Sequence, residues 1–388
     1  MLPQREDKEL YPYLQQGMMQ DARTWLDMPA DFDTALADAV QRMAEGVEHP
    51  LWKAFNDDHR RLFHAPRLEE LRFSKPKDMQ PLLGSLWPVY ECILLLSGLP
   101  DLLAFHKAFH IPEAITKATL ADMVLWVKEY KRKQGVWGCN ELGWLQYHFT
   151  GRLYRLGRLQ FMTARYEGHV YVYRHNDTGA YVVLAGDDIT IRQDGYVNGT
   201  CGRSEAGWVP AYKREDDRVI GHRSVEGRVL AEAEILPLNT HAPFLMPGDT
   251  ILEIHVPKDG RLEPEACMDS FRQALQFFPQ HFPQDAFAAF TCQSWLLSPG
   301  FMHILPHSNI RWFCEQFIQL PQQGSESQLY ERVYDCDSPA EKTTQAIDQL
   351  PQDTQLQRVL AQAIRSEDIP GGFGFFPIDQ INHMTSDL

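Results

Sequence analysis

The stretch GDTILEIHVPKDGRLEPEACMDSFRQALQFF, residues 248–278, decides the fold class. TILEIHVP alternates apolar side chains with others and predicts a strand, whereas PEACMDSFRQALQFF has helical spacing and Pro264 in its first turn. The loop KDGRLE, which contains one glycine, lies between them. Many proteins bind a phosphate or a thioester on a helix that follows a strand and a short loop, so the stretch indicates an α/β domain with a candidate binding site.

The rest of the chain divides into a helical part and a part that contains strands. Residues 1–157 show helical spacing of apolar residues almost throughout. Further on, HVYVYRHNDTGAYVVLAGD has two alternating runs on either side of NDTG, which predicts a β-hairpin. After residue 248 predicted strands and helices alternate. The sequence therefore predicts an α+β protein, with an all-helical domain at 1–157 and an α/β domain at 158–388.

The same patterns give more local predictions. Thr119 is predicted to cap a helix, with Asp122 three residues later, and Gly135 is predicted to end it. QLYERVYD, residues 328–335, is predicted to be a strand. The segment GRLYRLGRLQF places three arginines at helical spacing, where they either bind an anionic group or pair with acids at the domain junction: Arg152, Arg155 and Arg158.

The charge balance bounds the partners. The chain has 37 Lys and Arg against 52 Asp and Glu, a net charge of −15. This field repels polyanions, so nucleic acid is not expected as a partner. The N-terminal MLPQREDKELYPYLQQ carries charges where a signal peptide has an apolar core, and no apolar run is expected to reach the roughly 18 residues of a membrane span. We therefore expect a cytoplasmic protein with no membrane partner.

The cysteines and histidines show no metal or disulfide pattern. Seven cysteines are an odd number, and they form no CxxC pair, which predicts free thiols. The 15 histidines include no HExxH or comparable spacing. No metal site is predicted.

Seven segments together resemble a known family: LSGLP, IPEAITKATLADMVLW, HFTGRLYRLGRLQF, GDTILEIHVP, EACMDSFRQALQFF, TCQSWLLSP and ILPHSNIRWFCEQF. They are similar, in order and over most of the chain, to bacterial acyltransferase-domain proteins with an N-terminal N-acyltransferase helical domain and a GNAT-like C-terminal domain. The resemblance implies a GNAT-like α/β domain with a mixed, mostly antiparallel sheet. It also implies acyl transfer from a thioester, but no particular substrate.

In the GNAT fold two adjacent parallel strands separate, and the acyl group lies between them. The resemblance implies that ILEIHVP and FTCQSWLL are these strands and that KDGRLE meets the cofactor pyrophosphate. Coenzyme A or acyl-coenzyme A is the implied cosubstrate, with four contacts: Val256, Lys258, Gly260 and Arg261. The loop departs from the family pattern, because its second small residue is missing and Pro264 removes a backbone donor. Carrier-bound acyl groups, a different docking of coenzyme A and loss of catalysis stay open.

The strand TILEIHVP carries the candidate catalytic pair. Alternation places Glu253 and His255 on one face and only apolar residues on the other. Histidine titrates near neutral pH and a nearby carboxylate makes it more basic, so the pair could accept a proton from an amine. The alternative is a partly solvated face, or a histidine that hydrogen-bonds in the core.

Two further segments supply candidate substrate contacts. In FTCQSWLL, Cys292 is either a nucleophile relayed through His255 or a buried small hydrophobe, Ser294 lines the cleft, and Trp295 either walls a pocket or belongs to the core. In PHSNIRWF, Ser308 and Asn309 begin a helix with Arg311 in its first turns. That helix start either binds an anion or is an ordinary N-cap.

These observations give two functional hypotheses. The first is an acyltransferase that moves an acyl group from acyl-coenzyme A, or a carrier thioester, to an amine on a small molecule or other acceptor. Glu253 and His255 would assist deprotonation, and the strand backbone would polarise the thioester carbonyl. The second is a non-catalytic ligand-binding module that keeps the GNAT-like fold.

Overall fold

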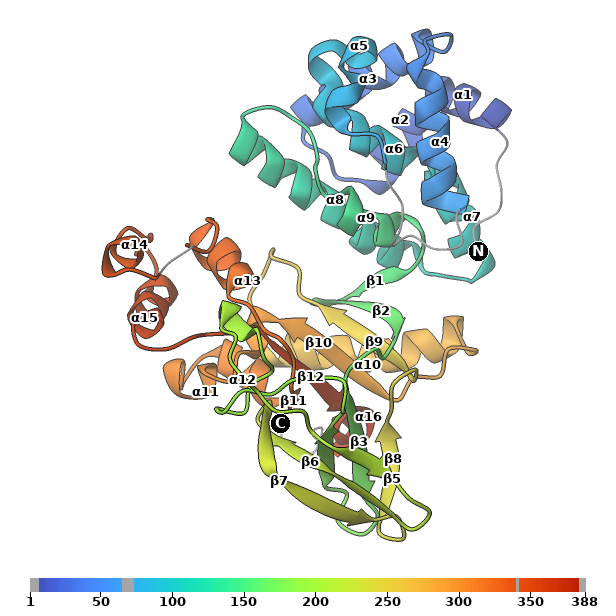
Figure 1. The fold of residues 1–388 in the computed structure, drawn as a ribbon. Helices are drawn as coiled ribbons and strands as arrows, with labels where there is room; N and C mark the ends of the chain where they lie inside the picture. The colour runs from blue at the N-terminus through green and yellow to red at the C-terminus, as the bar shows by residue number, and fades with distance from the viewer. Residues whose placement is uncertain (1–6, 65–72, 340–341, 384–388) are drawn as a thin grey trace. The chain divides into compact units, whose positions relative to one another are not determined.

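A computed structural model describes residues 7–64, 73–339 and 342–383 (Figure 1). The chain forms two compact units. The first contains Met1–Met162, Val256–Asp259 and Gln280–Phe282, and the second contains Thr163–His255, Gly260–Pro279 and Pro283–Leu388. These units interleave along the chain, and we retain the linear division at residues 157 and 158 as a proposal.

The first unit is built from helices around a buried central one. All eight residues of α6 (Tyr90–Ser97) are buried, as expected for a helix whose surface is mostly apolar. The principal helices around it are α1 (Asp7–Gln16), α2 (Met18–Trp25), α3 (Ala30–Glu45), α4 (Leu51–His64), α7 (Leu99–Ala108), α8 (Glu113–Gln134) and α9 (Leu142–Phe149). Their apolar faces form one continuous core with α6.

One helical stretch of this unit corrects the expectation about apolar runs. Among the described residues, Pro76–Ala108 is long and apolar enough, by length and composition, to cross a membrane. Of the most apolar 18-residue window in this stretch, 72% is buried inside the protein. A buried core helix passes the same test as a membrane span. The apolarity of this stretch is therefore accounted for by the core around α6.

Two local predictions in this unit are wrong and one is confirmed. Thr119 does not cap a helix, because α8 begins six residues earlier, after Pro112. Its buried hydroxyl accepts a hydrogen bond from the Arg155 backbone N–H at 2.9 Å. Gly135 ends α8 in the left-handed region, with φ of 74°, as predicted. The arginine segment is an antiparallel hairpin of β1 (Leu153–Leu156) and β2 (Leu159–Arg165), and not a helix.

The second unit contains the predicted mixed sheet. β9 (Thr250–His255) and β10 (Ala289–Ser294) are parallel, and β12 (Gly372–Pro377) is antiparallel both to β10 and to β11 (Ile318–Leu320). The helix α10 (Pro264–His281) follows β9, as its sequence predicted. Phe271 of α10 lies 5.2 Å from Phe290 and 5.0 Å from Phe376, measured between ring centroids, so the helix covers one face of this sheet.

A second sheet, which the sequence did not separate from the first, covers the other face. It contains β3 (Val170–His175), β4 (Tyr181–Ala185), β5 (Tyr212–Arg214), β6 (Arg218–Val225), β7 (Arg228–Pro237) and β8 (His241–Leu245), and every pairing described in it is antiparallel. The predicted hairpin is confirmed as β3 and β4. Val172 and Leu245 of this sheet share a core cluster with Ile251 and Phe375 of the mixed sheet. The fold class is thus α+β, as predicted.

The C-terminal region contains one further wrong prediction. QLYERVYD is not a strand: it forms the short helix α13 (Ser327–Leu329) and a π-helical turn, Tyr330–Tyr334. Leu329, Tyr330 and Tyr334 are buried against α15 (Gln355–Ile364). Burial on these helices, and not strand pairing, explains the apolar residues of the segment.

Candidate active site

The parallel strands β9 and β10 form the frame of the candidate site. Leu252 pairs with Phe290 and Glu253 with Thr291, and no later pair of these two strands is described. His255 and Gln293 therefore lie beyond the last paired position of their strands. We call this last pair and the region beyond it the β9–β10 wedge. The two strands are those that the family resemblance implied.

Strand pairing decides which side chains share a face. Paired residues project to the same side of a sheet, so Glu253 and His255 share their face with Thr291 and Gln293. Cys292 projects to the opposite face, with Leu252 and Phe290, where α10 packs. The face that carries the candidate catalytic pair is thus separate from the face that carries the cysteine.

Glu253 and His255 lie together as predicted. The Nε2 atom of His255 is 3.9 Å from Oε2 of Glu253, and their side chains are 31% and 38% exposed. This separation is beyond an ordinary hydrogen bond but within ion-pair range. Both side chains are partly exposed, whereas the Nε2 atom of His255 is itself buried. The geometry allows the carboxylate to stabilise a protonated imidazole after the imidazole accepts a proton. The catalytic role of the pair stays a prediction.

Two polar residues on this face were not among the predicted site residues. Thr291 is fully buried beside Glu253, and among the described residues its Oγ1 has no hydrogen-bond partner. Gln293 is exposed and lies two residues further along the same face. The signal was present in the alternation of FTCQSWLL, but it identifies these two residues only when β10 is known to lie parallel to β9 with Thr291 opposite Glu253.

Cys292 does not fit the proposed relay through His255. It lies on the α10 face and is 2% exposed. Burial raises the pKa of its thiol far above the ordinary value, with a smaller contribution from the nearby Glu253 charge. A buried thiol with a raised pKa is a poor nucleophile, because the thiolate is the reactive form. Cys292 therefore fits the alternative interpretation, a small buried hydrophobic residue, better than the nucleophile.

Ser294 and Trp295 are both engaged in local structure. The Ser294 hydroxyl caps a 3₁₀ turn, Trp295–Leu297, by accepting the Leu296 N–H at 3.2 Å. Trp295 lies after the end of β10, and its ring contacts Phe301 edge-on at 5.8 Å. Packing with the C-terminal core thus accounts for Trp295, and substrate contacts by either residue stay predictions.

Ser308, Asn309 and Arg311 form an ordinary helix start. Ser308 caps α12 (Asn309–Glu315) by accepting the Arg311 N–H at 3.0 Å. The Asn309 amide donates to Glu263 Oε2 at 3.1 Å, and the Arg311 guanidinium pairs with Glu315 at 2.7 Å. These contacts match the N-cap alternative. The predicted anion binding has no support beyond the helix start itself.

The loop between β9 and α10 contributes residues to both units. Gly260 and Arg261 are exposed and belong to the second unit, just before the first turn of α10. Glu263 and Glu265 flank the start of this helix. Their negative charge opposes phosphate binding there, whereas the helix dipole favours it.

Val256 and Lys258 belong to the first unit. The Lys258 ammonium is 3.1 Å from Glu129 and lies 4.9 Å from the ring centre of Trp126, both on α8. Arg132 and Lys258 together lower the pKa of Glu129 to about 2. Lys258 therefore already has a carboxylate partner, which a phosphate would have to replace or share.

The arginines of the hairpin hold the same loop. Arg155 makes a two-point ion pair with Asp259, at 2.7 and 3.1 Å, and Arg158 donates to the Pro257 carbonyl at 2.7 Å. Arg155 therefore pairs with an acid, which was the alternative to anion binding. These contacts fix the backbone of residues 256–259 immediately after the strand that carries His255.

Two parallel strands joined by a helix that covers their sheet, with a pairing that ends beside polar side chains, are the features of a GNAT-like fold. Comparison with known families agrees. Residues 153–376 match the GNAT-like C-terminal domain, and residues 18–151 match the N-acyltransferase N-terminal domain. The chain belongs to this family of two-domain proteins, which confirms the resemblance. No curated protein matches the chain significantly.

Solved structures share the fold over nearly the whole chain. A mutant acyltransferase in complex with octanoyl-CoA has a TM-score of 0.59 at 20% identity, covering 97% of this chain and 89% of that one. An acyltransferase in complex with decanoyl-CoA and teicoplanin has a TM-score of 0.56 at 20% identity, covering 97% and 90%. A third, with decanoyl-CoA, has 0.56 at 21% identity, covering 96% and 99%. The TM-scores and the coverage establish a common fold.

Proposed function

We propose that the protein is an acyltransferase that moves an acyl group from acyl-coenzyme A, or a carrier thioester, to an amine. One observation carries this proposal: β9 and β10 are parallel and their described pairing ends at Glu253 and Thr291, beside the polar face of the wedge. The family match supports acyl transfer. The related folds crystallised with octanoyl-CoA, decanoyl-CoA and CoA support acyl-coenzyme A as the cosubstrate.

The residues of the wedge have distinct roles in this proposal. His255 removes a proton from the acceptor ammonium before attack, or from the amine nitrogen as it attacks, and Glu253 stabilises the imidazolium that results. The backbone N–H groups at the end of β9 polarise the thioester carbonyl. The amine nitrogen forms the new bond to the carbonyl carbon, the carbon–sulfur bond breaks, and the thiolate leaves and is protonated. The loop with Gly260 and Arg261 meets the phosphates of the cosubstrate.

The acceptor is proposed to be a small molecule with a free amine. One related structure contains teicoplanin, and another contains 10C-teicoplanin together with CoA. We extend only the class of acceptor to this chain. The acidic net charge disfavours nucleic acid, and a cytoplasmic location without a membrane partner remains part of the proposal.

Thermal unfolding with a ligand series tests the cosubstrate. Free coenzyme A, acetyl-coenzyme A and octanoyl-coenzyme A are added to the purified protein, with 4′-phosphopantetheine as a fragment without the adenosine phosphates. A ligand present at 100 times its Kd stabilises the folded state by about 2.7 kcal/mol, which gives a clear rise in Tm. Coenzyme A transfer is contradicted if no thioester raises the Tm. A response to the pantetheine fragment equal to that of coenzyme A indicates a carrier thioester.

Substitution of His255 tests the chemistry separately from binding. His255→Gln is expected to lower kcat about 100-fold or more while the Kd for acyl-coenzyme A changes little, because proton transfer and cofactor binding are different functions. Steady-state kinetics with a model amine and thiol release give kcat, and calorimetry gives the Kd. His307→Gln, an exposed histidine outside the wedge, is the control. Wild-type kcat in His255→Gln removes this histidine from the mechanism.

The second hypothesis, a non-catalytic binding module, is favoured by the loop. It has one glycine where the family pattern has two small residues, and Glu263 and Glu265 flank the helix start. Its signature is a Tm rise with acyl-coenzyme A but no thiol release with any amine, in both wild type and His255→Gln.

A further inference from the structure

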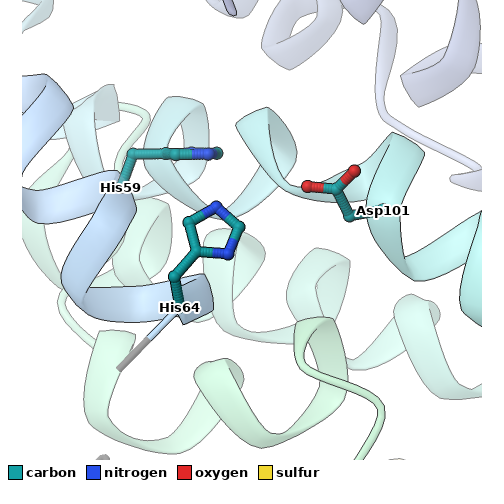
Figure 2. A group of neighbouring side chains, drawn as sticks. All are labelled: His59, His64 and Asp101. Atoms are coloured by element: carbon teal, nitrogen blue, oxygen red, sulfur yellow. The ribbon is translucent and has the colours of Figure 1, made fainter. Parts of the chain in front are cut away.

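A group of three side chains in the first unit has the chemistry of a metal site. His59 and His64 belong to α4, and Asp101 lies in the first turn of α7. One ligand atom from each lies within 4.8 Å of the other two. Figure 2 shows the two imidazole rings and the carboxylate around a common space. His59 and Asp101 are 2% and 5% exposed, whereas His64 is partly exposed at the end of its helix.

A hydrogen-bond relay orients the His59 ring. The Ser97 hydroxyl has one proton and donates it to the Leu94 carbonyl at 2.6 Å. Ser97 must therefore accept from His59, whose Nδ1 lies 2.7 Å away. Neutral His59 thus carries its proton on Nδ1 and its lone pair on Nε2. Metal-binding histidines in proteins are oriented in the same way, by a hydrogen bond from the other ring nitrogen.

Close packing brings the two helices together at this point. Gly98 joins α6 to α7, and a Cβ atom there would lie 2.1 Å from the Phe63 ring. The missing side chain lets the last turn of α4, with Phe63 and His64, approach the start of α7. The ring centroids of His59 and His64 are 5.6 Å apart at 70°, so the rings are not stacked face to face.

We propose that His59, His64 and Asp101 bind one Zn²⁺ ion, with water in the fourth position. Two imidazole nitrogens and a carboxylate suit zinc, whereas Mg²⁺ and Ca²⁺ prefer oxygen ligands. Tetrahedral zinc with bonds of about 2.0–2.2 Å places its ligand atoms roughly 3.3–3.6 Å apart. Binding therefore requires a modest contraction of the group. His64, the last residue of α4, can move to provide it.

A second group of possible ligands lacks this character. Cys201, Glu326 and Asp368 in the second unit also bring ligand atoms together. However, the Lys342 ammonium lies 2.6 Å from Glu326 and 2.8 Å from Asp368, so these carboxylate charges are already balanced by a cation. This group also lacks the two imidazole ligands of the histidine group, which suit zinc. Local sequence spacing could not indicate the histidine group, because its ligands come from two separate helices.

Metal titration of the full chain, produced without a polyhistidine tag and stripped with chelator, tests the proposal. We expect one equivalent of Zn²⁺ by calorimetry, a Tm rise that chelator reverses, and a Co²⁺ adduct with the visible absorption of a four-coordinate site. Asp101→Asn and His64→Gln, which nearly keep side-chain size, are expected to weaken Zn²⁺ binding at least about tenfold. Ser97→Ala, which releases the His59 ring, should weaken it less.

The controls make the result decisive. His307→Gln, an exposed histidine in the second unit, should bind Zn²⁺ like the wild type. Circular dichroism of each metal-free variant checks that it is folded. The proposal is overturned if the wild-type chain binds no stoichiometric Zn²⁺, or if folded Asp101→Asn and His64→Gln bind it with wild-type affinity. No measurement in this set depends on acyl transfer, so its outcome is independent of the proposed function.

Discussion

The single side chain that distinguishes the wedge most clearly from an ordinary core is Thr291. Its buried hydroxyl has no described hydrogen-bond partner and lies opposite Glu253, on the face that also carries His255. A buried polar group without a partner costs stability unless a ligand satisfies it. Thr291 is therefore the residue at which stability and ligand binding should oppose each other.

Thr291→Val tests this opposition. Valine keeps the shape and removes the hydroxyl, so the free energy of unfolding is expected to rise by about 1 kcal/mol in chemical denaturation. The kcat/KM for the thioester should fall, because the hydroxyl is available to a bound acyl group. Ser294→Ala is the matched control, since it removes a hydroxyl that caps a turn and should lower stability by about 1 kcal/mol. A loss of stability in Thr291→Val would show that the hydroxyl has a structural partner.

His106 gives a pH dependence with a definite sign. Burial lowers the pKa of His106 from 6.5 to about 4. Between these values the unfolded chain binds a proton that the folded chain does not, so the contribution is fully present above pH 6.5 and is lost as pH falls toward 4. The full loss is about 3 kcal/mol. Urea unfolding of wild type and His106→Gln at pH 7.5 and 4.5 should show a smaller pH effect in the variant, and an equal effect would contradict the assignment.

At the scale of elements, the junction of α6 and α7 depends on the absence of one side chain. Gly98→Ala would place a Cβ atom 2.1 Å from the Phe63 ring, so either this ring or α4 must shift. We expect a loss of about 1–3 kcal/mol in the free energy of unfolding. Gly143→Ala on α9 meets nothing within 4 Å and should be neutral or slightly stabilising. Thermal unfolding of the two variants gives the comparison, and equal Tm values would argue against the close contact.

For the molecule as a whole, the structure describes all seven cysteines as free thiols, which confirms the sequence prediction. Cys336 is exposed, Cys201 is partly buried and the other five are buried. A thiol reagent should therefore react fast with about one group in the native protein and with all seven after denaturation. Reducing agent should leave the Tm unchanged. Fewer than seven thiols in denaturant without reductant would reveal a disulfide.

The sequence by itself determined the local elements of the fold and one face of the site. Alternation in TILEIHVP predicted that Glu253 and His255 share a face. The glycine at position 135 predicted the end of α8, and NDTG predicted the turn of a β-hairpin. These features depend on neighbours within a few residues, whose spacing sets strand or helix geometry. The quoted segments also identified the family, because seven of them occur in order.

Only the tertiary structure decided what depends on distant segments. Because Glu253 pairs with Thr291, Thr291 and Gln293 lie on the face of Glu253 and His255, and Cys292 lies on the opposite face. QLYERVYD is helical and not a strand, because its apolar residues pack against α15. Lys258 forms an ion pair with Glu129 of α8, and His64 lies close to Asp101. In both cases packing brings together residues that are far apart in the sequence.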